Sequence, residues 1–191
     1  YFYIYIYVCV CRYYIIVYIR LYYMTSGGSF LYFAYGSNLL RERLRLQNPS
    51  AEFVSVGRLK DYVLRFGLWA EHVDNAWNGG VATVEESRGE EVWGIVWRLS
   101  NQHLATLDRQ EQVYSPLQVT VDTDAGQLLC RTYRMNDFRP CLPSPHYKQV
   151  LCLGALQNGL PPDYRRKLES IETNKYSGPS SILEEIQLLM D

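Results

Sequence analysis

Short apolar runs separated by Gly, Asp or Asn dominate the middle of the chain. Seven of them are rich in Val, Tyr and Trp and predict strands, at residues 30–34, 53–56, 62–66, 81–85, 91–98, 117–122 and 127–135. Turns are expected at Gly79-Gly80 and Arg88-Gly89. Leu and other apolar residues at helical spacing predict helices at 39–46, 101–110, 147–156, 162–171 and 182–190.

Two of these helices have candidate N-caps, which are Ser37 or Asn38 for the first and Ser100 for the second. Few helices lie between the strands, which argues against a doubly wound parallel sheet. The pattern therefore predicts an α+β fold, a single-domain mixed, mostly antiparallel β-barrel with flanking helices.

The first 23 residues depart from this pattern, because Tyr and Ile alternate there and nine of the 17 Tyr fall within them. Repeated TA dinucleotides encode alternating Tyr and Ile, and repeated TG encodes alternating Cys and Val. We therefore predict that residues 1–23 are a translated upstream repeat that is not native. The true start would be Met24, and residues 24–191 would form the domain. Arg12 leaves the apolar run too short for a membrane span.

Charge and cysteine content narrow the classes further. The 191 residues carry a net charge of -1, which becomes -3 when Arg12 and Arg20 are set aside. This balance offers no electrostatic footprint for nucleic acid or an anionic membrane. Three cysteines follow Met24, at Cys130, Cys141 and Cys152. They are widely spaced and form no CxxC motif. That usage favours a reduced protein in the cytoplasm.

A first candidate for chemistry is the segment from Tyr32 to Leu39, where a strand runs into Gly36-Ser37-Asn38. Successive backbone N–H groups in such a turn form a nest for a carboxylate or an oxyanion. The same residues also suit an ordinary junction between a strand and a helix.

A second candidate is Glu111. Leu104, Leu107 and Glu111 share one face of the predicted helix, so the two Leu should bring Glu111 to the edge of the core. Loss of hydration raises a carboxyl pKa and makes it a usable general base near neutral pH. The alternative is a terminal Glu that turns to solvent. Asp108 and Arg109 lie off this face and are expected to be solvated.

A third candidate is Tyr147, which follows Pro143-Ser144-Pro145 and opens a predicted helix. The prolines make an extended approach to the helix. A phenol at that position can point a donor into a cleft or simply pack against the core.

Together these segments resemble the gamma-glutamylcyclotransferase family over nearly all of residues 30–176. The likeness rests on seven motifs in the right order: FLYFAYGSNLL (30–40), NPSAEFVSVGRLKDY (48–62), WNGGVATV (77–84), EEVWGIVWRL (90–99), LDRQEQV (107–113), LPSPHYK (142–148) and LCLGALQNGLPPDY (151–164). The resemblance implies a cytoplasmic lyase of the gamma-glutamyl cycle in glutathione metabolism. Such an enzyme converts γ-glutamyl amino acids to 5-oxoproline and a free amino acid.

The same resemblance implies no metal, no organic cofactor, a homodimer, and particular site residues. The family's catalytic Glu corresponds to Glu111. Its substrate-binding residues correspond to Tyr32, Phe33, Ala34, Tyr35, Gly36 and Ser37, with Tyr147 as a further contact and Tyr114 as the counterpart of a later Tyr.

One departure bears on activity. The family has Gly directly after the catalytic Glu, whereas this chain has Gln112 and a short stretch to Tyr114. If that position needs a positive φ, Gln112 is strained or the loop is rebuilt. Two alternatives therefore stand beside the main hypothesis. One is a relative that acts on γ-glutamylamines or glutathione, and the other is a binding protein that has lost turnover.

Overall fold

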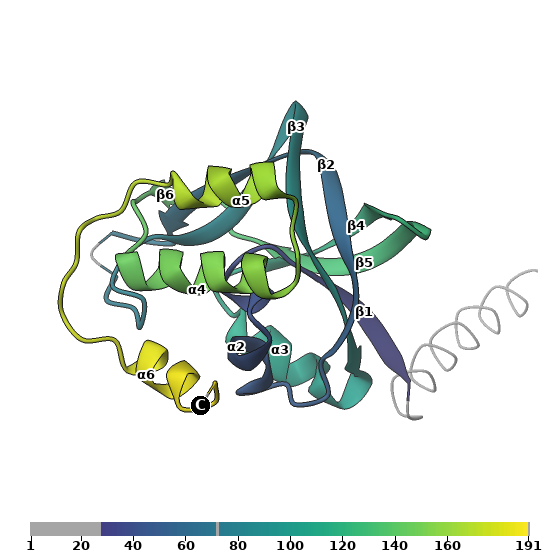
Figure 1. Cartoon of the computed structure of the whole chain (residues 1–191), viewed down its shortest axis with the longest axis horizontal. Helices are drawn as coiled ribbons and strands as arrows, with labels where there is room; N and C mark the ends of the chain where they lie inside the picture. The colour runs from purple at the N-terminus through teal and green to yellow at the C-terminus, as the bar shows by residue number, and fades with distance from the viewer. Residues whose placement is uncertain (1–27, 72, 191) are drawn as a thin grey trace, which may run out of the picture.

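The computed structural model describes residues 28–71 and 73–190 (Figure 1). The predicted upstream segment, residues 1–23, lies outside the described residues. Within them, five strands close into a barrel in the order β3-β1-β5-β4-β2, with β2 returning to β3 and a short sixth strand on the outer edge of β2. The strands are β1 (Ser29–Ala34), β2 (Glu52–Leu68), β3 (Val81–Ser100), β4 (Ser115–Thr123), β5 (Gly126–Arg134) and β6 (Arg139–Pro140).

The barrel is mixed and mostly antiparallel, as the sequence predicted. Its one parallel pair joins β1 to β5, where Tyr32 lies opposite Arg131. This closure leaves β2, β3, β1, β5 and β4 with paired neighbours on both sides, which protects their backbone groups from pairing with other chains.

Two long strands replace four predicted short ones, so the expected turn at Arg88-Gly89 is wrong. β2 and β3 pair antiparallel along most of their length and bend together where the register shifts between Lys60 and Tyr62. Asp61 and Gly89 both have positive φ, of 61° and 84°, and the Gly89 N–H donates to Asp61 Oδ1 at 2.8 Å. The glycine therefore accommodates a bend within a strand instead of a chain reversal.

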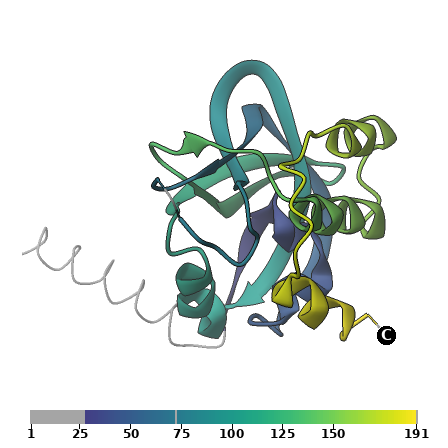
Figure 2. The ribbon, with the colours of Figure 1, turned by 90° about the vertical axis from the view of Figure 1, so that its left-hand side faces the viewer.

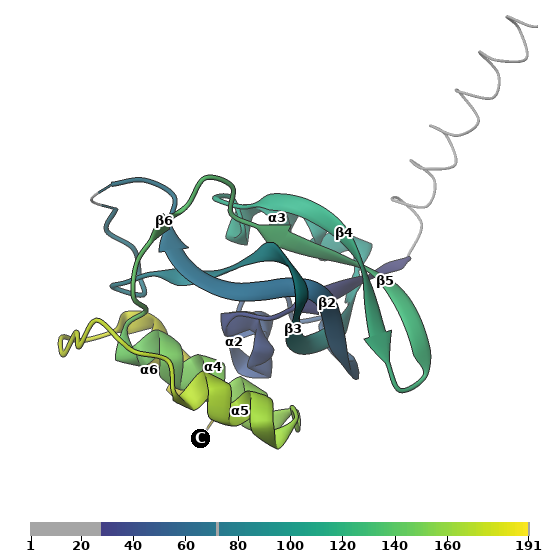
Figure 3. The same cartoon turned by 90° about the horizontal axis from the view of Figure 1, so that it is seen from above.

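The helices gather mainly on one side of the barrel (Figures 2 and 3). They are α2 (Arg41–Arg45), α3 (Leu104–Gln110), α4 (Pro145–Gln157), α5 (Pro162–Glu169) and α6 (Ser181–Gln187), with 3-10 turns η1 (Ser37–Leu39) and η2 (Asn101–His103). Ser100 caps η2 as predicted, because its side chain accepts a hydrogen bond from the N–H of Gln102. Ser144 caps α4 in the same way through the N–H of Tyr147.

The alternation of β1 links two apolar clusters. Phe33 and Tyr35 belong to one cluster, with valines of β3 and β4, whereas Tyr32 and Ala34 belong to the other, with Leu151 of α4. Helix α4 approaches η1 closely at Gly154, where an added Cβ would lie 2.4 Å from the backbone nitrogen of Leu40. Only glycine permits this approach, which brings the C-terminal half of α4 against the turn after β1.

Candidate active site

The turn after β1 places a polar side chain in the interior. Neither Ser37 nor Asn38 caps the following helix, so that prediction is wrong. Asn38 is instead buried, and its amide donates to Tyr32 Oη at 3.0 Å and to Glu111 Oε1 at 2.9 Å. The indole N–H of Trp97 donates to the Asn38 carbonyl at 3.1 Å and so helps to hold the turn in place.

A chain of amide groups fixes the orientation of Asn38. Its Oδ1 accepts from Gln110 Nε2 at 3.0 Å, and Gln110 Oε1 accepts from Asn48 Nδ2 at 2.9 Å. This arrangement leaves the Asn38 N–H₂ group as the donor toward the carboxylate. The amide chain therefore holds Glu111 Oε1, while no hydrogen bond from a described residue reaches Oε2.

Glu111 directly follows α3 and closes its C-terminus, with its N–H donating to the Leu107 carbonyl at 2.9 Å. Leu107 is fully buried, as the shared helix face predicted. Burial raises the pKa of the Glu111 carboxyl to about 7, and the charge of Arg43 and the hydrogen bond from Asn38 oppose this rise. The group can therefore gain and lose a proton near neutral pH.

The shortened loop after Glu111 is a tight turn. The N–H of Tyr114 donates to the Glu111 carbonyl at 2.8 Å, which carries Tyr114 directly onto the site. Gln112 is exposed and is not among the residues with positive φ. The missing glycine therefore leaves no strained backbone at this position.

Tyrosine side chains surround the carboxylate and form two groups. Those of one group donate their hydroxyl proton to a backbone carbonyl, and those of the other group do not. Tyr35 donates to the Tyr133 carbonyl at 2.5 Å, and Tyr114 donates to the Ala82 carbonyl at 2.9 Å. Tyr32 and Tyr147 instead accept hydrogen bonds, from Asn38 and from the N–H of Ala82 at 3.0 Å. Among the described residues neither finds an acceptor for its own proton, so both can donate to a ligand.

The hydroxyl of Tyr147 rests against Gly36. A Cβ added to Gly36 would lie 2.9 Å from that oxygen and 3.2 Å from the Cβ of Ala82. Burial raises the pKa of Tyr147 to about 12, with hydrogen bonds from the backbone of Ala82 and Ser37 opposing the rise. Tyr147 therefore stays protonated at neutral pH and remains a donor.

Tyr133 forms the far wall of the site and is fixed by an ion pair. Arg131 binds Asp108 at 2.7 Å, and the Tyr133 hydroxyl donates to Asp108 Oδ1 at 2.5 Å. The Asp108 side chain is 43% exposed and so meets solvent as predicted, but strand β5 also supplies it with two partners that the sequence did not reveal.

Glu111 lines two neighbouring chambers. The inner one holds about 40 Å³ and is lined mainly by the tyrosines and the turn after β1. The outer one holds about 280 Å³ and includes Arg43, Trp77 and Gln112. Four residues border both chambers: Ser37, Glu111, Tyr114 and Tyr147.

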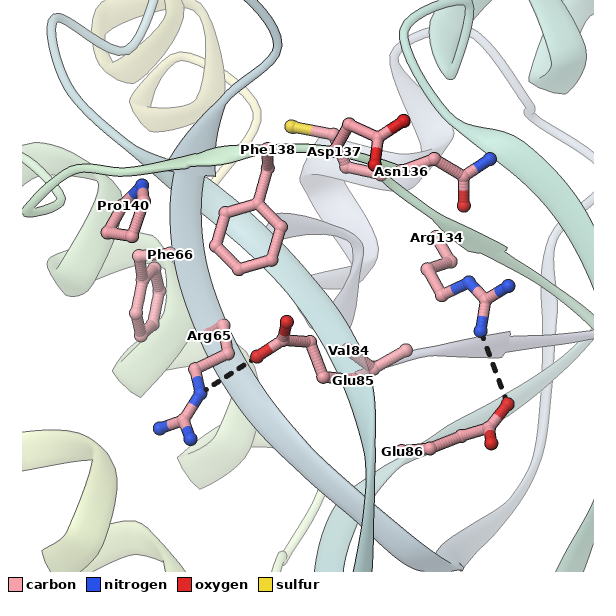
Figure 4. Close-up of a pocket in the computed structure, with 11 residues that line it drawn as sticks. Arg65, Phe66, Val84, Glu85, Glu86, Arg134, Asn136, Asp137, Phe138 and Pro140 are labelled. Carbon is pink, nitrogen blue, oxygen red and sulfur yellow. Dashed lines mark hydrogen bonds and ion pairs between the residues drawn. The ribbon is translucent and has the colours of Figure 1, made fainter.

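A larger hollow lies elsewhere and lacks these features. It lies between β2, β3 and the segment after β5 and holds about 740 Å³. Figure 4 shows its charges facing one another, with Arg65 paired to Glu85 at 3.1 Å and Arg134 to Glu86 at 3.4 Å. Its acidic groups are open to solvent, so size alone does not make it the better candidate.

The structure brings together seven of the nine residues singled out from the sequence. They line the inner chamber and are Tyr32, Tyr35, Gly36, Ser37, Glu111, Tyr114 and Tyr147. The side chains of Phe33 and Ala34 are fully buried and border neither chamber. Asn38, Tyr133 and the backbone of Ala82 were not singled out as site residues, although Asn38 belongs to the same motif.

Residues 28–71 and 73–190 contain no group of three or more His, Cys, Asp or Glu side chains placed to hold a metal ion. None of the helices in these ranges is long and apolar enough to cross a bilayer.

The fold and the site place the chain in a class and then in a family. Residues 91–168 match the AIG2-like family. A solved structure of a gamma-glutamyl cyclotransferase superposes with a TM-score of 0.81 at 46% identity, covering 85% of this chain and 98% of that one. The barrel with flanking helices is thus confirmed as the architecture of this class.

Sequence identity to curated relatives assigns the chain to a particular family. A gamma-glutamylcyclotransferase of Bos taurus is 52% identical over 167 residues, which is 85% of this chain and 88% of the relative. One of Homo sapiens is 48% identical over 164 residues, with coverages of 83% and 86%. The chain belongs to the gamma-glutamylcyclotransferase family, which confirms the resemblance found in the sequence and the prediction of an enzyme of this type.

Proposed function

We propose that this protein converts γ-glutamyl amino acids to 5-oxoproline and a free amino acid, with Glu111 as the general base. The observation that carries the proposal is the Glu111 carboxyl, which has a pKa of about 7 and borders two chambers. One chamber would hold the glutamyl group and the other the amino acid that leaves. The scissile amide would then lie beside the carboxylate.

The reaction moves two protons from the attacking nitrogen to the leaving nitrogen. Glu111 accepts the first proton from the α-ammonium of the substrate, and the freed amine attacks the γ-carbonyl carbon. As the C–N bond to the amino acid breaks, Glu111 passes this proton to the leaving nitrogen. Glu111 then takes the second proton from the ring nitrogen and passes it to the released amine, which leaves as an ammonium. Because the reacting groups are held together in the bound complex, their fixed orientation lowers the barrier by several kcal/mol. No water enters the balance.

Donors already in place would stabilise the oxygen that becomes negative. Tyr32 and Tyr147 each retain a proton for a ligand, and the turn at Gly36 adds its backbone N–H group at the wall of the inner chamber. These donors suit the oxyanion and the α-carboxylate of the glutamyl group, which share the same chemistry. The remaining binding residues would be Tyr35 and Tyr114, with Phe33 and Ala34 holding the strand beneath them.

The test compares wild type with Glu111→Gln on γ-glutamyl-alanine, following release of 5-oxoproline. Loss of the base is expected to lower kcat by at least about 100-fold while substrate binding persists. Ligand binding is measured separately by calorimetry with the same substrate. Turnover that survives in Glu111→Gln contradicts the assignment, and wild type that binds without turnover identifies a binding protein.

Related substrates, location and assembly complete the proposal. The amino-acid substrate is favoured over glutathione and over ε-(γ-glutamyl)lysine, and both are included in the same assay. A cytoplasmic role in glutathione metabolism and a homodimer are carried over from the family resemblance. Analytical ultracentrifugation of residues 24–191 tests the dimer directly.

A further inference from the structure

Arg43 is a buried cation for which the described residues supply no ion-pair partner. It lies in α2 and is 8% exposed. It forms no ion pair or side-chain hydrogen bond with any residue in the described part of the chain, and its Nε is a buried donor left unsatisfied. An unpaired buried charge is costly, and buried polar groups in folded proteins almost always have partners.

The guanidinium is nevertheless held in a defined place. Its Cζ lies 5.8 Å from the ring centroid of Trp77, and that ring packs edge-on against Tyr147 with centroids 4.9 Å apart. A cation over an indole face is favourable and still leaves the in-plane N–H donors open. Arg43 is therefore positioned without having its hydrogen bonds used.

The surroundings of Arg43 point to an anion that arrives with a ligand. Arg43 and Trp77 line the outer chamber but not the inner one, and Glu111 borders both. Glu111 and the exposed Glu185 of α6 are the acidic groups that act on Arg43 through space, although neither forms an ion pair with it. The outer chamber is thus lined by both the N–H donors of the Arg43 guanidinium and the Glu111 carboxylate.

Substrate chemistry supplies the matching group. In a γ-glutamyl amino acid, the scissile nitrogen and the free carboxylate of the leaving amino acid are bonded to the same carbon. If the amide lies beside Glu111 with its glutamyl part in the inner chamber, that carboxylate must enter the outer chamber. A guanidinium binds a carboxylate through two parallel hydrogen bonds, which a buried setting strengthens.

We infer that Arg43 recognises the α-carboxylate of the amino acid to be released, and so makes the enzyme select γ-glutamyl amino acids over γ-glutamylamines. This inference rests on the proposed function, because it needs the amide to lie at Glu111. Arg43 would bind the leaving amino acid, whereas other residues would bind the glutamyl part of the substrate.

A matched pair of substrates isolates the carboxylate. γ-Glutamyl-ethylamine is γ-glutamyl-alanine without that single group, and both release 5-oxoproline. Wild type is expected to favour γ-glutamyl-alanine by about 10- to 100-fold in kcat/KM. Free alanine should inhibit it more strongly than ethylamine does. Equal kcat/KM for the two substrates overturns the inference, whereas absence of product from both overturns the proposed function instead.

Substitutions then assign the preference to Arg43. Arg43→Met should bring the ratio of the two kcat/KM values close to one, chiefly by raising KM for γ-glutamyl-alanine. Arg43→Lys keeps the charge without the fork and should give an intermediate ratio. Arg65→Met, in an exposed ion pair of the larger hollow, is the matched control and should leave the ratio unchanged.

An indirect role of Arg43 predicts a different pattern. If Arg43 serves only to tune Glu111 or to hold α2 in place, its loss should lower kcat/KM for both substrates by the same factor. The ratio of the two kcat/KM values would then stay unchanged. That result contradicts the inference. If Arg43→Met does not fold, Arg43→Lys and the two wild-type measurements decide the matter.

Discussion

Asn38 donates a hydrogen bond to Glu111 across 2.9 Å, although 73 positions separate the two residues in the sequence. The bond ties the turn after β1 to the end of α3, and the amide chain through Gln110 fixes which way it points. Because the donor favours the ionised carboxylate, it limits how far burial raises the Glu111 pKa. Several measurable consequences depend on this balance.

The first concerns the pH dependence of catalysis. Glu111 acts as a base only when ionised, and burial raises its pKa to about 7. We expect kcat/KM for γ-glutamyl-alanine to rise with pH and level off above about 7, falling tenfold per unit on the acid side. An acid limb centred near the ordinary carboxyl value, below pH 5, contradicts this assignment.

The second concerns Asn38. In Asn38→Ala the carboxylate loses a donor to its ionised form, so the acid limb of the same profile should move upward by about one pH unit or less. Gln110→Ala is the graded comparison, because it removes the support of Asn38 and keeps the Asn38 donor itself, so its acid limb should move less than that of Asn38→Ala. An unchanged acid limb in a folded Asn38→Ala protein argues against this tuning role.

The third concerns stability. The folded-state pKa of Glu111 is raised above its unfolded value, so its contribution is present below about pH 4.5 and is lost as pH rises through about 7. Glu111→Gln removes this titration. Its unfolding free energy relative to wild type should therefore grow by about 2–3 kcal/mol between pH 4.5 and pH 8. Chemical denaturation of both proteins across this range measures the difference, and a constant gap rules the linkage out.

The fourth concerns the contact between Gly36 and Tyr147. Gly36→Ala places a methyl group 2.9 Å from the Tyr147 oxygen, so one of the two must shift. We expect a fall in kcat/KM of about tenfold or more, since misplacement of binding groups lowers rates steeply. In a Tyr147→Phe background the same alanine should cost less, because the crowded oxygen is gone. Additive effects in this double-mutant cycle would show that the two positions act independently.

Much of the fold follows from local pattern, because strand and helix periodicities are short-range properties. Leu107 and Glu111 illustrate this, since their spacing alone placed the carboxylate at the edge of the core. The sequence pattern predicts four short strands where the structure has the two long strands β2 and β3. It fails there because a glycine such as Gly89 is equally compatible with a turn and with a bend inside a strand. Which of these occurs depends on the partner strand and its Asp61.

The site shows the same division. Residues of the YGSN segment and Glu111 could be found from sequence, whereas their mutual bond depends on tertiary contacts. Asn38 has the appearance of a helix cap, and only the closed barrel reveals that its amide points inward. Arg43 alternates with Leu at helical spacing, which is typical of a solvated face, and its burial arises from Trp77 far along the chain.

The contact of Tyr147 with Ala82 has a consequence for synthesis of the chain. It spans 65 positions, and the bond from Tyr35 to the Tyr133 carbonyl spans 98. A nascent chain that has exposed only Glu111 and the turn after β1 therefore lacks two walls of the inner chamber. Because such distant contacts form slowly, the pocket closes late, after α4 has emerged from the ribosome, and shorter fragments should be inert.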